Sequence, residues 1–368
     1  MLSYGEHQGR VRLSFDVSPA PAYAAFTLAE PDRIVLDFPA LRWAVEPEPD
    51  FGPIPYISSI RHGLFRRDRA RMILALSEPV SIDRIFTEKA RPDRPGRLVI
   101  DLSPAGRAAF DARAGTPERA RWRDYDAATR VPAEADDIIV AIDPGHGGID
   151  PGAVAGAMIE KNIVLDFARK LAGVIDARDG FRAAMIRDDD SFVPLSERVA
   201  RAKRAGAHLL ISIHADTVAE GTASGMSAYT LSDEGSDEAA VALAERENRA
   251  DIIAGADLGG ETDNLTRLLV ELAQRGTQAE SIKLASAVIR KISDKVAVLR
   301  SRPLRRAAFR VLKSPDMPSI LLELGFLNSK RDQKRLADPE WVAMATGAVA
   351  DGIAAWRATA SPGFTRRR

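Results

Sequence analysis

The stretch IIVAIDPGHGG, residues 138–148, decides the fold of the larger part of the chain. Its five consecutive apolar residues followed by Asp-Pro-Gly are typical of a buried strand that runs into a tight loop. The proline and glycines of this loop leave little side-chain bulk around His146. Because α/β proteins bind ligands at the carboxyl ends of their strands, we expect His146 to lie in a functional site at a sheet edge.

A second histidine follows another strand-like run, HLLISIHAD, which ends at His214 and Asp216. The chain has only five histidines, so two of them at strand ends indicate one shared metal site. It has no cysteine, so any metal must be held by histidine and carboxylate ligands. Glu160 opens a predicted helix and is the natural third ligand, although a capping role at the helix N-terminus is the alternative. His208 lies about 20 Å from His214 along an extended strand and is excluded from the site.

Glu323 is the candidate general base. It stands within SILLELGFLN, an apolar strand that ends at Gly325. A carboxylate among leucines is costly unless it is paired or functional. Arg310 or Arg187 could pair with it, but the predicted position beside the histidine strands favours a catalytic role.

Composition narrows the classes of function. The 368 residues are enough for two domains, and 52 basic side chains balance 52 acidic ones, so no overall charge favours a nucleic-acid partner. No apolar run reaches the 18–20 or so residues of a membrane span. The N-terminal MLSYGEHQGR has no apolar signal core, so an exported protein would lack its signal peptide in this chain. We expect a monomer.

Residues 1–104 have the alternating pattern of short strands. The motif RIVLDF at 33–38 recurs as RLVIDL at 97–102, which suggests two related β units packed face to face, a small β-sandwich. Residues 105–136 are expected to form a linker, and residues 359–368 a basic, solvated tail. The predicted strands are Val11–Val17, Arg33–Phe38, Ala70–Leu76, Val80–Phe86 and Arg97–Leu102.

Residues 137–358 alternate between strand and helix signals, which predicts an α/β domain with a central mixed sheet flanked by helices. The predicted strands are Ile138–Ile142, Ala183–Ile186, Leu209–Ile213, Met226–Leu231, Phe309–Leu312 and Ser319–Leu324. The predicted helices are Lys161–Ala177, Pro194–Ala205, Asp237–Ala254, Thr262–Val296 and Trp341–Trp356.

Four motifs together resemble a known family. DPGHGG, the helix-opening glutamate of GAMIEKN, SIHAD and LLELGFL occur in this order over about 220 residues, as in the zinc-dependent N-acetylmuramoyl-L-alanine amidases of the amidase_3 type. The resemblance implies that His146, Glu160 and His214 bind one Zn²⁺ and that Glu323 is catalytic. The front domain is similar to the AMIN domain, which in this family targets the septum by binding peptidoglycan.

The implied reaction is hydrolysis of the amide between N-acetylmuramic acid and L-alanine of the stem peptide, in septal wall splitting and daughter-cell separation. Zinc would activate water and stabilise the oxyanion, and Glu323 would carry the proton to the departing L-alanine nitrogen. The implied location is the periplasm.

An insert at about 234–260, with the segment ERENRADIIAG, is similar to the regulatory helix of the division amidases. In that family the helix covers the cleft and one of its glutamates binds the zinc. We expect Glu247 in this role, with Glu245 as the alternative, and a hinge at the Gly-rich exit. The implied partner is a division activator with a LytM domain that displaces the helix.

Two other interpretations use the same residues. A zinc peptidase acting between amino acids of wall peptides needs the same ligands and base. A catalytically silent peptidoglycan-binding protein with a permanently capped zinc is the second alternative, although such a protein has no need of Glu323 as a base.

Overall fold

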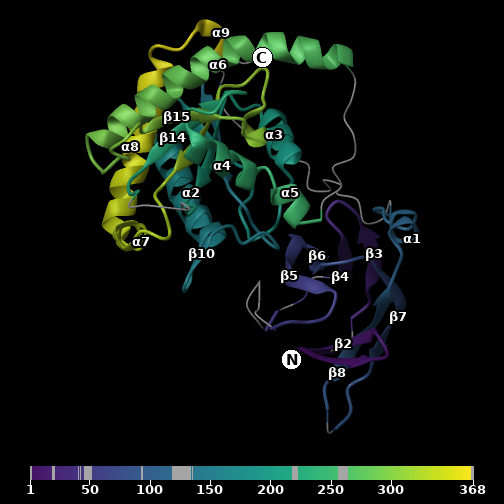
Figure 1. Cartoon of the computed structure of the whole chain (residues 1–368). Coiled ribbons are helices and arrows are strands. Elements are labelled where there is room, and N and C mark those ends of the chain that lie inside the picture. The colour runs from purple at the N-terminus through teal and green to yellow at the C-terminus, as the bar shows by residue number, and fades with distance from the viewer. Residues whose placement is uncertain are drawn as a thin grey trace. The chain divides into compact units, whose positions relative to one another are not determined.

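A computed structural model of the chain describes residues 2–365 except 19–20, 40, 42, 45–51, 93, 118–133, 135, 218–222 and 256–263. Its contacts divide the chain into two compact units. One consists of Met1–Arg123 with Ile252–Leu258, and the other of Asp124–Asp251 with Gly259–Arg368. We call them the β unit and the catalytic unit (Figure 1). Most of the expected linker, 118–133, lies outside the described residues.

The β unit is built from two four-stranded antiparallel sheets, with strand orders β1-β2-β8-β7 and β3-β4-β6-β5. Alternating apolar residues from both sheets, such as Leu13, Leu36 and Ile100, share one core, which is the arrangement of a β-sandwich. The short helix α1, Arg107–Asp111, follows. The strands are β1 Leu2–His7, β2 Arg10–Val17, β3 Ala24–Leu28, β4 Arg33–Pro39, β5 Ile57–Arg66, β6 Arg69–Leu76, β7 Val80–Glu88 and β8 Gly96–Pro104.

The repeated motif falls on β4 and β8, and each of these is an inner strand of a different sheet. The two sequence halves are nevertheless interleaved. The sheet that contains β8 also contains β1 and β2, which come from the first half of the sequence. The sheet that contains β4 also contains β5 and β6, which follow the first copy of the motif in the sequence. The predicted sandwich is therefore confirmed, but neither sheet corresponds to one half of the sequence.

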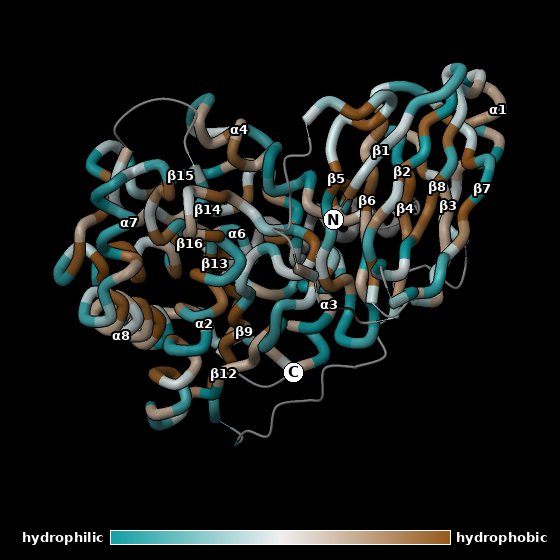
Figure 2. The backbone as a smooth tube through the Cα atoms, turned by 90° about the horizontal axis from the view of Figure 1, so that it is seen from below, coloured by the Kyte–Doolittle hydropathy of each residue, from teal (hydrophilic) through white to brown (hydrophobic). Residues whose placement is uncertain are grey.

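The catalytic unit has a six-stranded mixed sheet of order β12-β9-β13-β16-β14-β15. All neighbours are parallel except β16 and β14. The inner strands β9 and β13 are mostly apolar (Figure 2), as expected for a sheet covered on both faces. The strands are β9 Ile138–Pro144, β12 Phe181–Met185, β13 Leu209–His214, β14 Ser227–Leu231, β15 Leu304–Ala307 and β16 Ser319–Glu323, and β10 Val154–Ala155 and β11 Met158–Ile159 form a small hairpin.

Helices cover both faces of this sheet. One face packs on α2 (Glu160–Asp176), α6 (Asn264–Ser293) and α8 (Pro339–Arg357), where Val288 and Ile353 share one hydrophobic core with the strand residue Ile211. The opposite face packs on α3 (Leu195–Arg204) through Ala202. Two short helices, α7 (Lys330–Leu336) and α9 (Pro362–Thr365), complete the unit. Within the described residues, no helix has the length and apolar character needed to cross a membrane.

Two predicted elements were wrong in detail. Phe309–Leu312 is not a strand, because Arg310–Leu312 forms a 3₁₀ turn and the neighbouring strand is β15. A short apolar run has the same hydrophobic pattern in a strand and in a 3₁₀ turn, so its periodicity cannot distinguish the two. The single helix expected at Asp237–Ala254 divides into α4 (Glu238–Glu247) and α5 (Ala250–Ile253). Between them the side chain of Asn248 donates to the carbonyl of Ala308.

Candidate metal centre and active site

His146 lies in the loop after β9 and has a left-handed backbone, with φ of 57°. Two glycines allow the neighbouring side chains to close on one another. A Cβ at Gly145 would come within 2.3 Å of the His214 ring, and one at Gly152 within 2.7 Å of the Glu160 carboxylate. Both distances are too short for a Cβ, so the loop holds its histidine and the adjacent ligand candidates only because these positions are glycine.

Two buried arginines fix this loop through its backbone carbonyls. Arg198 of α3 donates to the carbonyls of Pro144 and His146, at 2.8 and 2.7 Å, and to the Asp143 carboxylate at 2.8 Å. Arg187 donates to the carbonyls of Pro144 and Gly145. Arginine presents several donors in a fixed plane, so one side chain can hold more than one carbonyl. The sequence hypothesis that Arg187 pairs with Glu323 has no support, since its recorded partners are carbonyls.

His214 and Glu323 are neighbours across the sheet. They occupy matching positions at the ends of the parallel strands β13 and β16. Glu323 is completely buried, its Oε2 accepts from the Asp216 N–H at 3.2 Å, and its Oε1 has no hydrogen-bond partner among the described residues. An unpartnered buried carboxylate oxygen is costly, so this atom is available for a substrate or a proton.

Glu160 is the first residue of α2 and is fully buried. Its Oε1 lies 3.1 Å from His146 Nε2 and 3.2 Å from His214 Nδ1, and it accepts from the Ala215 N–H at 2.8 Å. The Oε2 accepts from the Ala153 N–H at 2.8 Å. These contacts do not support helix capping as the role of Glu160, because both N–H groups that donate to its carboxylate lie outside α2. They orient the carboxylate toward the two imidazoles.

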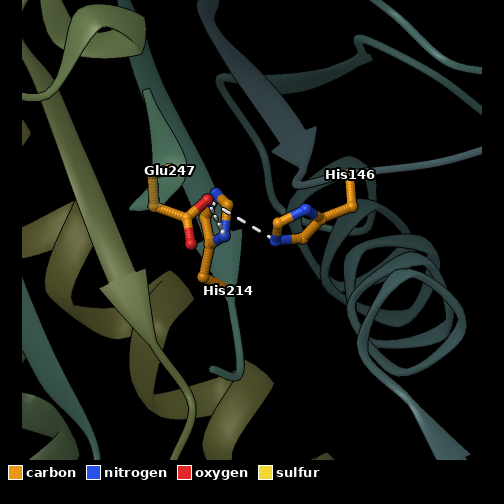
Figure 3. A group of neighbouring side chains, drawn as sticks. All are labelled: His146, His214 and Glu247. Carbon is orange, nitrogen blue, oxygen red and sulfur yellow. Dashed lines mark ion pairs between the residues drawn. The ribbon is translucent and has the colours of Figure 1, made fainter. Parts of the chain in front are cut away.

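Glu247 reaches the same two histidines from α4. Its Oε2 lies 3.1 Å from His214 Nδ1 and 3.5 Å from His146 Nε2 (Figure 3). Its side chain is buried, and it lines one small pocket together with both histidines. Glu245, the alternative in the sequence analysis, is exposed to solvent.

This group of side chains fits a metal ion. His146 Nε2 and His214 Nδ1 are buried, and among the described residues their recorded partners are the carboxylates of Glu160 and Glu247. One ring nitrogen from each histidine and one Glu247 oxygen lie within 4.8 Å of one another, and Glu160 Oε1 is also close to both imidazoles. Neutral imidazole and carboxylate ligands around one point are the donor set of hydrolytic zinc centres.

The charges of the site shift its pKa values. Burial raises the pKa of Glu323 well above its usual value, and the carboxylates of Glu160 and Asp216 raise it further. Burial alone would lower the pKa of His146, but the carboxylates of Glu160 and Asp150 outweigh it, so the pKa is raised well above the ordinary value. Several carboxylates around two histidines leave an excess of negative charge that a divalent cation would neutralise.

Asp150 is a site residue that the sequence analysis missed. Its Oδ2 lies 2.9 Å from His146 Nδ1, and its Oδ1 accepts from the Gly152 N–H at 3.2 Å. A carboxylate on the far nitrogen of an imidazole fixes the tautomer that leaves Nε2 free to bind a metal. The available signal was an aspartate four residues after the loop histidine, within the same glycine-rich segment.

The fold and the site together define a class of protein. It is an α/β protein that carries histidines and carboxylates, able to hold a metal, at the carboxyl edge of its sheet. Residues 140–355 match the family model described as N-acetylmuramoyl-L-alanine amidase, and residues 3–102 match that of the AMIN domain. The chain belongs to the N-acetylmuramoyl-L-alanine amidase family.

Named relatives agree with this assignment. The chain is 32% identical to the N-acetylmuramoyl-L-alanine amidase AmiC of Escherichia coli, over 91% of this chain and 83% of the relative. It is 30% identical to AmiC of Neisseria meningitidis, over 93% and 86% of the two chains. Among solved structures, amidase AmiC2 of Nostoc punctiforme is 27% identical and covers 61% of this chain and 98% of its own, with a TM-score of 0.45.

Proposed function

We propose that this peptidoglycan amidase is a zinc enzyme of the periplasm that splits septal wall, and that Glu247 keeps it inactive until a partner displaces α4. The convergence of Glu160 and Glu247 on the same two imidazole nitrogens carries the proposal. A hydrolytic zinc needs three protein ligands and one open position. With His146, His214 and Glu160 as ligands, Glu247 would occupy the position that the reaction needs.

The proposed chemistry assigns a role to each buried group. Zinc, when bound, supplies a Lewis acid that polarises the amide carbonyl and activates water near neutral pH. Glu323 would take the proton of the attacking water on Oε1, which has no hydrogen-bond partner among the described residues, and deliver it to the departing L-alanine nitrogen as the C–N bond breaks. Burial and the neighbouring carboxylate of Glu160 raise its pKa above that of an ordinary glutamate, which favours a side chain that can hold a proton between the two steps. Asp150 holds the His146 ring in place.

The proposed inhibition also has a mechanical basis. Arg246, next to Glu247, forms an ion pair with Asp216 at 2.7 Å and donates to the carbonyl of Thr217 at 3.0 Å. The capping helix is therefore held to the segment that directly follows His214. By family resemblance, a division activator with a LytM domain would break these contacts and remove Glu247 from the site.

Cleavage of purified sacculi tests the proposal. We expect Glu247→Ala to raise the rate at least tenfold, since it opens a ligand position without removing His146, His214 or Glu160. Glu245→Ala, an exposed neighbour on the same helix, is the matched control and should behave as the unmodified chain. Elemental analysis should find one zinc per chain.

The products distinguish the remaining alternatives. Mass spectrometry should find intact stem peptides that begin with L-alanine. Fragments cut between amino acids would support a wall peptidase instead. If Glu247→Ala contains zinc but cleaves nothing, the chain is a silent binding protein and the proposed inhibition is wrong.

A further inference from the structure

The outer face of the sheet β3-β4-β6-β5 is buried, which is unexpected in a sandwich. Ile34 and Leu36 of β4 point into the shared core, so Val35 between them points to the other side. Val35 is nevertheless fully buried, as is Arg71, and Ile73 is only 3% exposed. The outer face of an antiparallel sheet normally carries polar, solvated side chains. Another segment of the chain must cover this one.

The covering segment is Ile252–Gly255, which we call the strap. It belongs to the β unit by its contacts although it follows the catalytic unit's α4 in sequence. Arg71 donates through Nη1 to the strap carbonyls of Ala254, at 3.2 Å, and Gly255, at 2.7 Å. Arg33 donates to the carbonyl of Ile252.

Arg71 is itself rigidly held within the β unit. Its Nε and Nη2 form two parallel hydrogen bonds with the Asp37 carboxylate, at 2.6 and 2.9 Å, and its guanidinium lies 3.4 Å over the centre of the Phe65 ring. The remaining nitrogen, Nη1, is thereby directed at the strap. A buried arginine whose donors are this fully used makes strong, directional hydrogen bonds to carbonyls.

Gly255 fits the strap against the sheet. Its φ of 57° is left-handed, and a Cβ there would lie 3.2 Å from Ile73 Cδ1 and 3.3 Å from Val35 Cγ2. Any side chain at this position would be strained in backbone and crowded against both strands. The backbone of the strap therefore contacts the sheet as closely as only glycine permits.

We propose that the outer face of this sheet is a docking surface for the strap, and that docking holds Glu247 at the metal centre. The inference rests on the proposed capping role of Glu247. Only four residues separate Glu247 from Ile252, and Asp251 between them accepts from the Leu195 N–H of α3 at 2.9 Å. A strap bound to the β unit restrains the end of α4, so release of the strap loosens the cap.

Gly255→Val in the full-length chain tests the proposal, because it crowds Val35 and Ile73 without altering any residue of the metal centre. Loss of two charged hydrogen bonds from the strap should speed amide hydrogen exchange at 252–255, and in α4 at 238–247, by about tenfold or more. Sacculus hydrolysis should rise by a similar factor, toward that of Glu247→Ala. Arg71→Lys, which keeps the charge beside Asp37 but loses the planar fork, should shift all three in the same direction.

Gly52→Val is the matched control. Gly52 also lies in the β unit with a left-handed φ of 70°, but a Cβ there meets nothing within 4 Å. It should leave exchange in the strap and α4 unchanged. If Gly255→Val does not speed exchange in the strap, the docking surface is wrong. If the strap loosens while α4 and hydrolysis stay unchanged, the coupling is wrong.

The proposed capping role fails separately, if Glu247→Ala is no more active than the unmodified chain. In that case hydrogen exchange still decides whether the strap docks and whether α4 follows it.

Discussion

At the scale of single residues, Glu323 carries the sharpest expectation. We expect Glu323→Gln, made in a Glu247→Ala background, to lose hydrolysis by about 10²–10⁴-fold, the usual contribution of a positioned acid-base group. Glutamine keeps the shape and can still accept from the Asp216 N–H, but it cannot take up a proton. Initial rates on sacculi measure the loss.

Zinc content separates this role from a structural one. Because Glu323 is not among the proposed ligands, the variant should retain its zinc by elemental analysis. A variant that loses the metal along with its activity would show that Glu323 holds the centre together. In that case the proton transfer must be assigned to another group.

Residue types and spacing predicted most of the candidate site. His146, His214 and Glu323 each stand where an apolar run ends, so the parallel order of β9, β13 and β16 brings them together. Asp150 was missed because its role depends on the left-handed turn at His146, which places a carboxylate four residues later under the imidazole. The local sequence pattern does not indicate this backbone geometry.

At the scale of elements, apolar runs were predictable, including the edge strands β7 and β12, whereas a polar edge strand was not. Strands such as β9 and β13 are buried on both faces and have nearly continuous apolar sequences. The edge strand β1 was missed because its side chains are mostly exposed and polar, so the sequence Leu2–His7 has no apolar face. Pairing with β2, rather than composition, makes this segment a strand.

Asp351 of α8 joins three helices of the catalytic unit. Lys295, just beyond α6, donates to its carboxylate at 2.6 Å, and Arg178, just beyond α2, donates to its other oxygen. Burial alone would raise the pKa of Asp351, but these hydrogen bonds outweigh it and lower the pKa below the usual value. The carboxylate therefore stabilises the fold above its unfolded pKa of about 4.

Asp351→Asn should lower the free energy of unfolding by about 0.5–1 kcal/mol at pH 7, the range for solvent-screened pairs. A lowered folded pKa means that this contribution is lost as the pH falls through that value. The difference between variant and unmodified chain should therefore shrink on acidification below about pH 4. Urea titrations at pH 7 and at successively lower pH measure it. A difference that does not change with pH would assign the effect to packing.

At the scale of the whole molecule, each unit has a hydrophobic core of its own. Leu36 is fully buried in the core of the β unit, and Leu171 of α2 is fully buried in that of the catalytic unit. The sequence predicted this division from the change between alternating strands and strand-helix repeats. It could not predict the strap, because a segment next to α4 is assigned to the β unit only by contacts such as those of Arg71.

Leu36→Ala and Leu171→Ala form a matched pair that tests this division. Each should destabilise its own unit by about 2–5 kcal/mol through lost burial and a cavity. In calorimetry we expect two unfolding transitions, and each variant should lower the midpoint of one of them.

Because the strap docks on the β unit, Leu36→Ala should also raise the rate of sacculus hydrolysis at temperatures between the two midpoints. In that interval the β unit is unfolded and the catalytic unit is still folded. Leu171→Ala has no such interval, and its hydrolysis should only fall on heating. If both variants shift a single common transition, the two units fold as one, and the strap is held by the whole molecule rather than by the outer face of one sheet.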